Sequence, residues 1–111
     1  HVKIGYIIVL SLTCVMFASP SVADETLVGK ILFTQGHVGS NCRTVKHREN
    51  STGTERYFRI ADATSGASDD DNVAAIVLSA LIANRDTLIN FTPGQTTGCG
   101  TEPKIIYITI L

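Results

Sequence analysis

The sequence predicts a mainly β domain with one helix, an α+β chain whose elements follow the order β-β-β-α-β-β. Three observations support this prediction. Four short stretches rich in β-branched and aromatic residues and one short polar stretch are separated by turn signals; one stretch after residue 70 has apolar residues at helical spacing; and two cysteines follow an apolar leader. A chain of 111 residues has room for one domain.

Residues 1–23 have the pattern of a secretory signal peptide. Lys3 is their only charge, an apolar run covers residues 7–18, and small residues lead up to Ala23 just before two acidic residues. The run falls short of the roughly 20 apolar residues that a membrane-spanning helix needs. We therefore expect cleavage after Ala23, a single domain over residues 24–111, secreted or periplasmic localisation, and no membrane span in the mature chain.

The cysteines downstream of this leader form an even pair. Cys42 and Cys99 lie 57 positions apart, and such a pair in a small exported domain indicates a disulfide. Closing a loop of this length contributes on the order of 4 kcal/mol to stability. Two unrelated buried thiols are the alternative. Because no CxxC or Cys/His cluster with zinc spacing is present, we predict neither a metal site nor a cofactor.

The first half of the mature chain contains three predicted strands. The first covers residues 26–35, with Gly29 marking a bend or bulge in a strand that curls within a small barrel. Residues 42–49 and 55–61 predict a hairpin, because the turn signal at residues 50–53 lies between them. Strict alternation in the first strand places four residues on one face: Leu27, Gly29, Ile31 and Phe33.

The second half begins with a helix. Its apolar stripe consists of Val73, Ile76, Val77, Ala80 and Leu81, and Leu78 and Ile82 broaden it. The acidic residues 69–71, preceded by Ser68, favour a helix start, and Asn84 is the expected terminator.

Two further strands follow the helix, at residues 87–92 and 104–111. Pro93 and Gly94 turn the first of them. The last strand is apolar on both faces, a pattern that fits either a strand buried in a closed barrel or a strand that pairs with another subunit.

This order of elements is that of the OB-fold, a five-stranded barrel with its helix between the third and fourth strands. In that fold the loop between the first two strands and the loop between the last two lie at the same edge. Cys42 ends the first loop and Cys99 lies in the second, so a bridge between them is geometrically sensible. An open sheet around the helix and a cystatin-like fold are the alternatives; neither predicts that the cysteines are close.

A small exported domain with one disulfide and this order of elements resembles the B subunits of bacterial AB5 toxins, which form pentameric rings that bind cell-surface glycans. The resemblance covers the mature chain in architecture. It includes no matching sequence motif, so it transfers no binding residues to this chain. It implies a glycan ligand and a homo-oligomer.

The predicted hairpin carries a basic and aromatic surface, which is the candidate binding site. The residues proposed for it are Arg43, His47, Arg56, Tyr57 and Arg59. In OB-folds the face of strands two and three binds oligonucleotides or oligosaccharides. Arginine can hold a carboxylate through two hydrogen bonds, and a tyrosine ring can cover a sugar face. An ordinary solvated hairpin with scattered charges is the alternative interpretation.

Charge and export narrow the class of partner. The formal net charge of −1 provides no general attraction to polyanions, and an exported protein rarely meets nucleic acid. The histidines are not accompanied by a GxSxG elbow, the acidic residues do not follow the EF-hand pattern, and the glycine-rich segment does not follow the P-loop pattern. We therefore expect a non-catalytic protein that recognises a glycan or an exported protein. The alternatives are a periplasmic structural or inhibitory protein without a small-molecule ligand, and a hydrolase without familiar motifs.

Overall fold

The structure, a computed structural model, describes residues 22–61 and 70–111; the predicted signal peptide lies almost wholly outside the described residues, as does Ser68 before the helix. The order β-β-β-α-β-β is confirmed. The elements are β1 (Glu25–Gln35), the short 3-10 helix η2 (Ser40–Cys42), β2 (Arg43–Glu49), β3 (Glu55–Ile60), α1 (Asp70–Ala83), β4 (Asp86–Thr96) and β5 (Pro103–Ile110).

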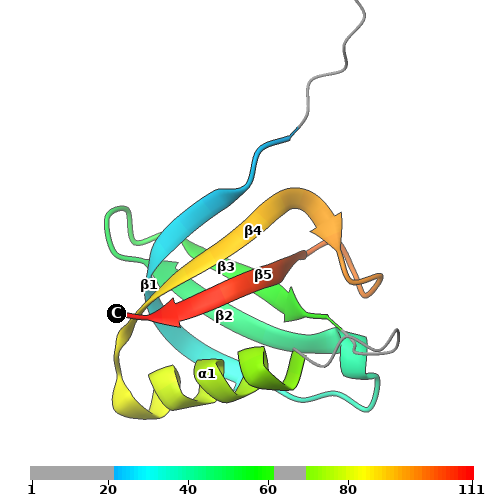
Figure 1. The fold of residues 1–111 in the computed structure, drawn as a ribbon, viewed down its shortest axis with the longest axis horizontal. Coiled ribbons are helices and arrows are strands. Elements are labelled where there is room, and N and C mark those ends of the chain that lie inside the picture. The colour runs from blue at the N-terminus through cyan, green and yellow to red at the C-terminus, as the bar shows by residue number, and fades with distance from the viewer. Residues whose placement is uncertain (1–21, 62–69) are drawn as a thin grey trace, which may run out of the picture.

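The five strands close into a barrel in the order β1-β2-β3-β5-β4, with β4 paired back onto β1 (Figure 1). All neighbouring strands are antiparallel except β3 and β5, which run parallel and share one bridge, between Arg59 and Lys104. The predicted OB-like barrel is thus confirmed, and its closure excludes an open sheet around the helix. Within the described ranges, no helix is long and apolar enough to cross a membrane.

Strand β1 takes part in both halves of the barrel, and a glycine allows it to do so. Gly29 pairs with Glu49 of β2 and with Thr87 of β4. A Cβ atom at this position would lie 1.9 Å from the carbonyl oxygen of Arg48, so only glycine fits. The bend or bulge predicted at Gly29 is therefore a position where the backbones of β1 and β2 approach closely.

The register shift in β1 comes two residues after Gly29, between Ile31 and Phe33. Because of this shift, the predicted placement of Ile31 and Phe33 on the same face is wrong. Ile31 is buried in the barrel, whereas Phe33 is 36% exposed on its outer surface. A bulge adds one residue to one strand, so every side chain beyond it changes face.

The core fills the barrel and the space under α1. Its buried apolar side chains are Leu27, Ile31, Val45, Phe58, Ile60, Val77, Ala80, Ile89, Phe91, Ile105 and Ile108. Near its centre the rings of Phe58 and Phe91 meet edge to face, with centroids 5.0 Å apart. β5 therefore contributes to a closed core, through Ile105 and Ile108.

Helix α1 lies against β1 and β5 and covers one end of the barrel (Figure 1). Val77 and Ala80 are buried, as the apolar stripe predicts, but Leu78 and Ile82 are 48% and 77% exposed. The broadening of the apolar stripe by these two residues does not lead to their burial, because a single barrel end covers only one face of the helix. Asn84 ends the helix with a φ of 52°, the left-handed conformation usual at a helix end.

Candidate functional site

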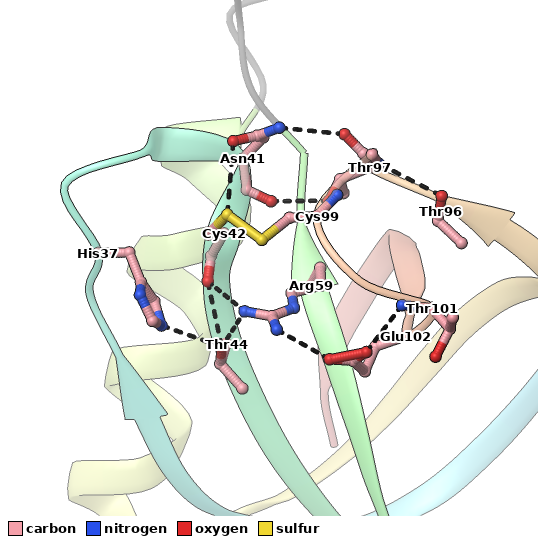
Figure 2. Close-up of a disulfide and its surroundings, with 11 residues drawn as sticks. His37, Asn41, Cys42, Thr44, Arg59, Thr96, Thr97, Cys99, Thr101 and Glu102 are labelled. Carbon is pink, nitrogen blue, oxygen red and sulfur yellow. Dashed lines mark hydrogen bonds and ion pairs between the residues drawn. A yellow bond between two sulfur atoms is a disulfide. The ribbon is translucent and has the colours of Figure 1, made fainter.

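The disulfide joins two loops at one edge of the barrel. Cys42 and Cys99 are bonded, with their Cα atoms 5.3 Å apart, which confirms the predicted pairing (Figure 2). Next to the bridge, the side-chain amide of Asn41 donates to the carbonyl oxygen of Thr97 over 3.3 Å, and the Thr97 hydroxyl donates to the carbonyl oxygen of Asn41 over 2.6 Å. One covalent and two hydrogen bonds therefore fix the loop before β2 to the loop between β4 and β5.

Arg59 connects this edge to β3. Its guanidinium donates to the carbonyl oxygen of Cys42 over 2.5 Å, to the Thr44 hydroxyl over 2.6 Å and to the Glu102 carboxylate over 2.8 Å (Figure 2). The hydrogen bond from Arg59 holds the pKa of Glu102 below its usual value. Because β3 and β5 share a single backbone bridge, the Arg59–Glu102 pair is a second link across that seam.

The outer surface of the first three strands carries a row of one lysine between two aromatic rings. Phe33 of β1 pairs with Lys46 of β2, and Lys46 pairs with Tyr57 of β3, so their side chains are neighbours on one face. The ring centroids of Phe33 and Tyr57 are 6.0 Å apart, and the Lys46 ammonium lies 5.9 Å and 5.3 Å from them. We call these three residues the Phe33–Lys46–Tyr57 cluster.

Glu55 completes the surroundings of the cluster. It precedes Tyr57 by two positions on β3, so both side chains point outward. Its carboxylate lies 2.9 Å from the Lys46 ammonium, and this hydrogen bond raises the pKa of Lys46. Phe33 and Tyr57 remain 36% and 45% exposed, so a ligand can reach both rings.

The structure brings together only part of the predicted site. Tyr57 lies in the cluster, and Arg59 lies two residues further along the same face of β3. Arg43 is directed elsewhere: its guanidinium bonds the carbonyl oxygen of Ala61 and forms an ion pair with Asp71 in the first turn of α1. Arg56 is exposed but occupies the register position of His47, on the opposite face of the hairpin from Tyr57.

The expected surface position of His47 is wrong. Its side chain is fully buried, and its ring contacts the edge of Phe58 at a centroid distance of 6.2 Å. Alternation along β2 explains this, because Val45 and His47 face the barrel interior while Lys46 and Arg48 face outward. Neither ring nitrogen makes a hydrogen bond of good geometry to a described residue. Burial lowers the pKa of the ring, although the backbone of Thr87 and of Gly29 acts in the opposite direction.

The buried ring predicts that acid destabilises the protein. The unfolded chain, in which the His47 pKa is near 6.5, takes up a proton that the folded chain excludes. The free energy of unfolding is therefore fully retained above that pH and decreases as the pH falls below it, by up to about 1.4 kcal/mol per pH unit. Glu49 opposes this effect by favouring the charged ring, and Arg56 adds to it. Urea unfolding between pH 8 and pH 5 measures the slope.

Two variants assign that slope to His47. His47→Leu places an apolar side chain of similar size in the core and is expected to remove most of the slope. His37→Gln, a substitution at an exposed position, is expected to leave the slope intact. An equal slope in the His47→Leu protein would contradict this explanation.

Sequence reasoning missed Phe33, Glu55 and Glu102 as parts of the site. Alternation places Phe33 on the same face as Ile31, because the bulge in β1 leaves no mark in the sequence pattern. Glu102 is 43 residues from Arg59, and only closure of the barrel brings them together. The outward position of Lys46, by contrast, could be predicted, because alternation along β2 places its two neighbours, Val45 and His47, on the inner face.

The described residues contain no group of three His, Cys, Asp or Glu side chains able to hold a metal ion. An open hollow of about 450 Å³ lies beside β1 and the β2–β3 turn, lined by Thr26, Val28, Glu49, Asn50 and Ser51, and it includes no residue of the cluster.

Comparison of the chain with family models, curated proteins and solved structures found no match. The geometry of this outer surface is therefore the basis for assigning a function.

Proposed function

We propose that this protein is exported and binds a glycan through the Phe33–Lys46–Tyr57 cluster, without catalysing a reaction. The observation that carries the proposal is the row of two exposed rings and one lysine across β1, β2 and β3. In OB-type barrels, ligands bind over strands two and three and the adjoining loops. The cluster occupies that face, and the disulfide-linked loops lie at its edge.

The chemistry of the cluster suits a sugar. Each aromatic ring offers an apolar face to the C–H groups of a pyranose, while Lys46 and Glu55 supply a donor and an acceptor for its hydroxyls. The next outward position on β3, about 6.6 Å away along the strand, holds the Arg59–Glu102 pair. Apolar faces beside a few placed polar groups are what a carbohydrate site requires.

The disulfide contributes by holding this edge in place before a ligand arrives. Arg59 bonds the carbonyl oxygen of Cys42, so the covalent bridge also positions the guanidinium beside the cluster. Binding to an ordered surface loses less conformational entropy than binding to mobile loops.

A second observation supports a different function. Leu78 and Ile82 give α1 an exposed apolar face, and such a face is commonly covered by another protein. It favours a structural or inhibitory exported protein, or assembly into a ring like that of the AB5 B subunits. Co-purification with an exported enzyme, in the absence of any glycan binding, would support this alternative.

The glycan proposal predicts loss of binding when either ring is removed. Tyr57→Ala and Phe33→Ala are each expected to weaken binding about tenfold or more, because each deletes one stacking surface. A glycan array identifies the ligand, and calorimetric titration measures the change in affinity.

Tyr107→Ala is the matched control. Tyr107 is 48% exposed, close to the 45% of Tyr57, but it lies on β5 and outside the cluster. Its removal should leave the affinity unchanged. Equal losses in the Tyr57 and Tyr107 variants, or binding to no glycan at all, would contradict the proposal.

A further inference from the structure

We infer that the ligand of the Phe33–Lys46–Tyr57 cluster is a neutral saccharide rather than a sialylated, sulfated or uronic acid-containing one. This inference rests on the proposed function and specifies its substrate class. It departs from the expectation that the basic residues of the hairpin are there to bind an anionic group, because the two cations nearest the rings, Lys46 and Arg59, are each paired with a carboxylate.

The central cation of the surface is neutralised within the protein. The Lys46 ammonium lies 2.9 Å from the Glu55 carboxylate, and that hydrogen bond raises the pKa of Lys46, so the lysine stays charged and paired at neutral pH. An anionic ligand group placed over the rings would have to displace Glu55 from Lys46 or lie beside its carboxylate. Either arrangement has an unfavourable electrostatic energy, which is absent when the ligand is neutral.

The neighbouring cation is neutralised in the same way. Arg59 is 2.8 Å from Glu102, and two further acceptors, on Cys42 and Thr44, occupy its other terminal nitrogen. Its side chain is only 14% exposed. The lowered pKa of Glu102 keeps this carboxylate ionised under mildly acidic conditions as well. Arg59 therefore has little capacity to bind a ligand carboxylate or sulfate.

Two other arginines of β2 do not change this balance. Arg43 faces α1 and pairs with Asp71. Arg48 points outward, but its register partner on β3 is Glu55, the carboxylate that already pairs with Lys46. The Arg48 side chain is also exposed, so an ion pair between it and an anionic group of the ligand would contribute little to the affinity.

The same arrangement favours a neutral polyol. Glu55 and Glu102 each have carboxylate lone pairs that accept hydrogen bonds from sugar hydroxyls, and a carboxylate is a stronger acceptor than an uncharged oxygen. The Lys46 ammonium has further N–H groups to donate beside its bond to Glu55. A saccharide with hydroxyls on its edge and C–H groups on its face thus finds partners for both across the cluster.

The test uses the full mature protein with its disulfide intact. It is titrated with matched pairs of oligosaccharides: a neutral chain, and the same chain carrying a terminal sialic acid or a sulfate. We expect the neutral member to bind about tenfold or more tightly, and its affinity to change by less than about twofold between 20 mM and 500 mM NaCl, because screening acts on charged partners.

A charge-removing variant makes the test specific. Glu55→Gln frees Lys46 and is expected to shift the preference about tenfold toward the acidic member of each pair. Asp86→Asn is the matched control: it breaks the Lys30–Asp86 ion pair, of 3.0 Å, outside the cluster and should leave the preference unchanged.

The outcomes separate the two proposals. Tighter binding of the acidic glycans by the unmodified protein, weakened by salt, would overturn the neutral-ligand inference and leave glycan binding standing. An unchanged preference in the Glu55→Gln protein would also overturn it. Binding of neither member of any pair would overturn the proposed function, and this inference with it.

Discussion

Replacing Gly29 with alanine is expected to destabilise the barrel by at least about 3 kcal/mol, a large share of the total stability of a domain this small. The added Cβ would lie 1.9 Å from the carbonyl oxygen and 2.8 Å from the carbonyl carbon of Arg48, and 2.9 Å from the Cα of Glu49. These are backbone atoms, so no side-chain rotation can relieve the overlap.

The overlap at Gly29 affects two strand pairs at once. The residue pairs with β2 and β4, and its carbonyl oxygen accepts a hydrogen bond of 3.1 Å from the buried Thr87 hydroxyl. Moving β1 away from Arg48 would therefore disturb the β1–β4 ladder as well. Urea unfolding followed by circular dichroism measures the loss of stability.

Gly36→Ala is the control for the general effect of adding a methyl group to a glycine. Gly36 follows β1, and no atom lies within 4 Å of the position where its Cβ would be. We expect a change within about 0.5 kcal/mol at this exposed site. Similar unfolding midpoints for the Gly29→Ala and Gly36→Ala proteins would show that β1 and β2 do not approach each other as described.

Removing the disulfide is the second change with a large expected effect. The double substitution Cys42→Ala and Cys99→Ala opens a 57-residue loop and is expected to cost about 4 kcal/mol, mainly because the unfolded chain regains conformational freedom. The loop contains β2, β3, α1 and β4, so the crosslink restrains most of the domain. In a domain this small, such a loss is a large share of the total stability.

The loss should be measured by unfolding the oxidised protein, the reduced protein and the double variant under one set of conditions. Reduction and double substitution are expected to give similar losses, and both should weaken the proposed glycan binding because Arg59 bonds the carbonyl oxygen of Cys42. Mass spectrometry that finds two free thiols in the purified protein, or an unfolding curve that does not respond to reductant, would contradict the prediction.

The fold was predictable because its signals are local. Turn residues separate the strands, apolar residues at helical spacing mark α1, and the order of elements limits the ways in which a short chain can close. The cysteine pair then added one long-range constraint. Cys42 ends the loop before β2 and Cys99 lies in the loop between β4 and β5, and an OB-type barrel brings these two loops to one edge. The order of elements and the disulfide therefore supported the same fold.

The candidate site was only partly predictable because its membership depends on which face each side chain takes. Alternation along the third strand predicts that Tyr57 faces outward and Phe58 faces inward, and the structure confirms both. His47 was grouped with its charged neighbours on sequence proximity, whereas adjacent residues of a strand face opposite sides.

By itself, then, the sequence determined the order of the strands and of α1 and the outward position of Tyr57, because periodicity and turn chemistry act over a few residues. The cysteine pairing followed from the even number of cysteines after the leader. Only the tertiary structure decided that Phe33 joins Lys46 and Tyr57, and that Arg59 is paired with Glu102. The first depends on a bulge that changes the face of the chain, and the second on a contact across 43 residues that forms when the barrel closes.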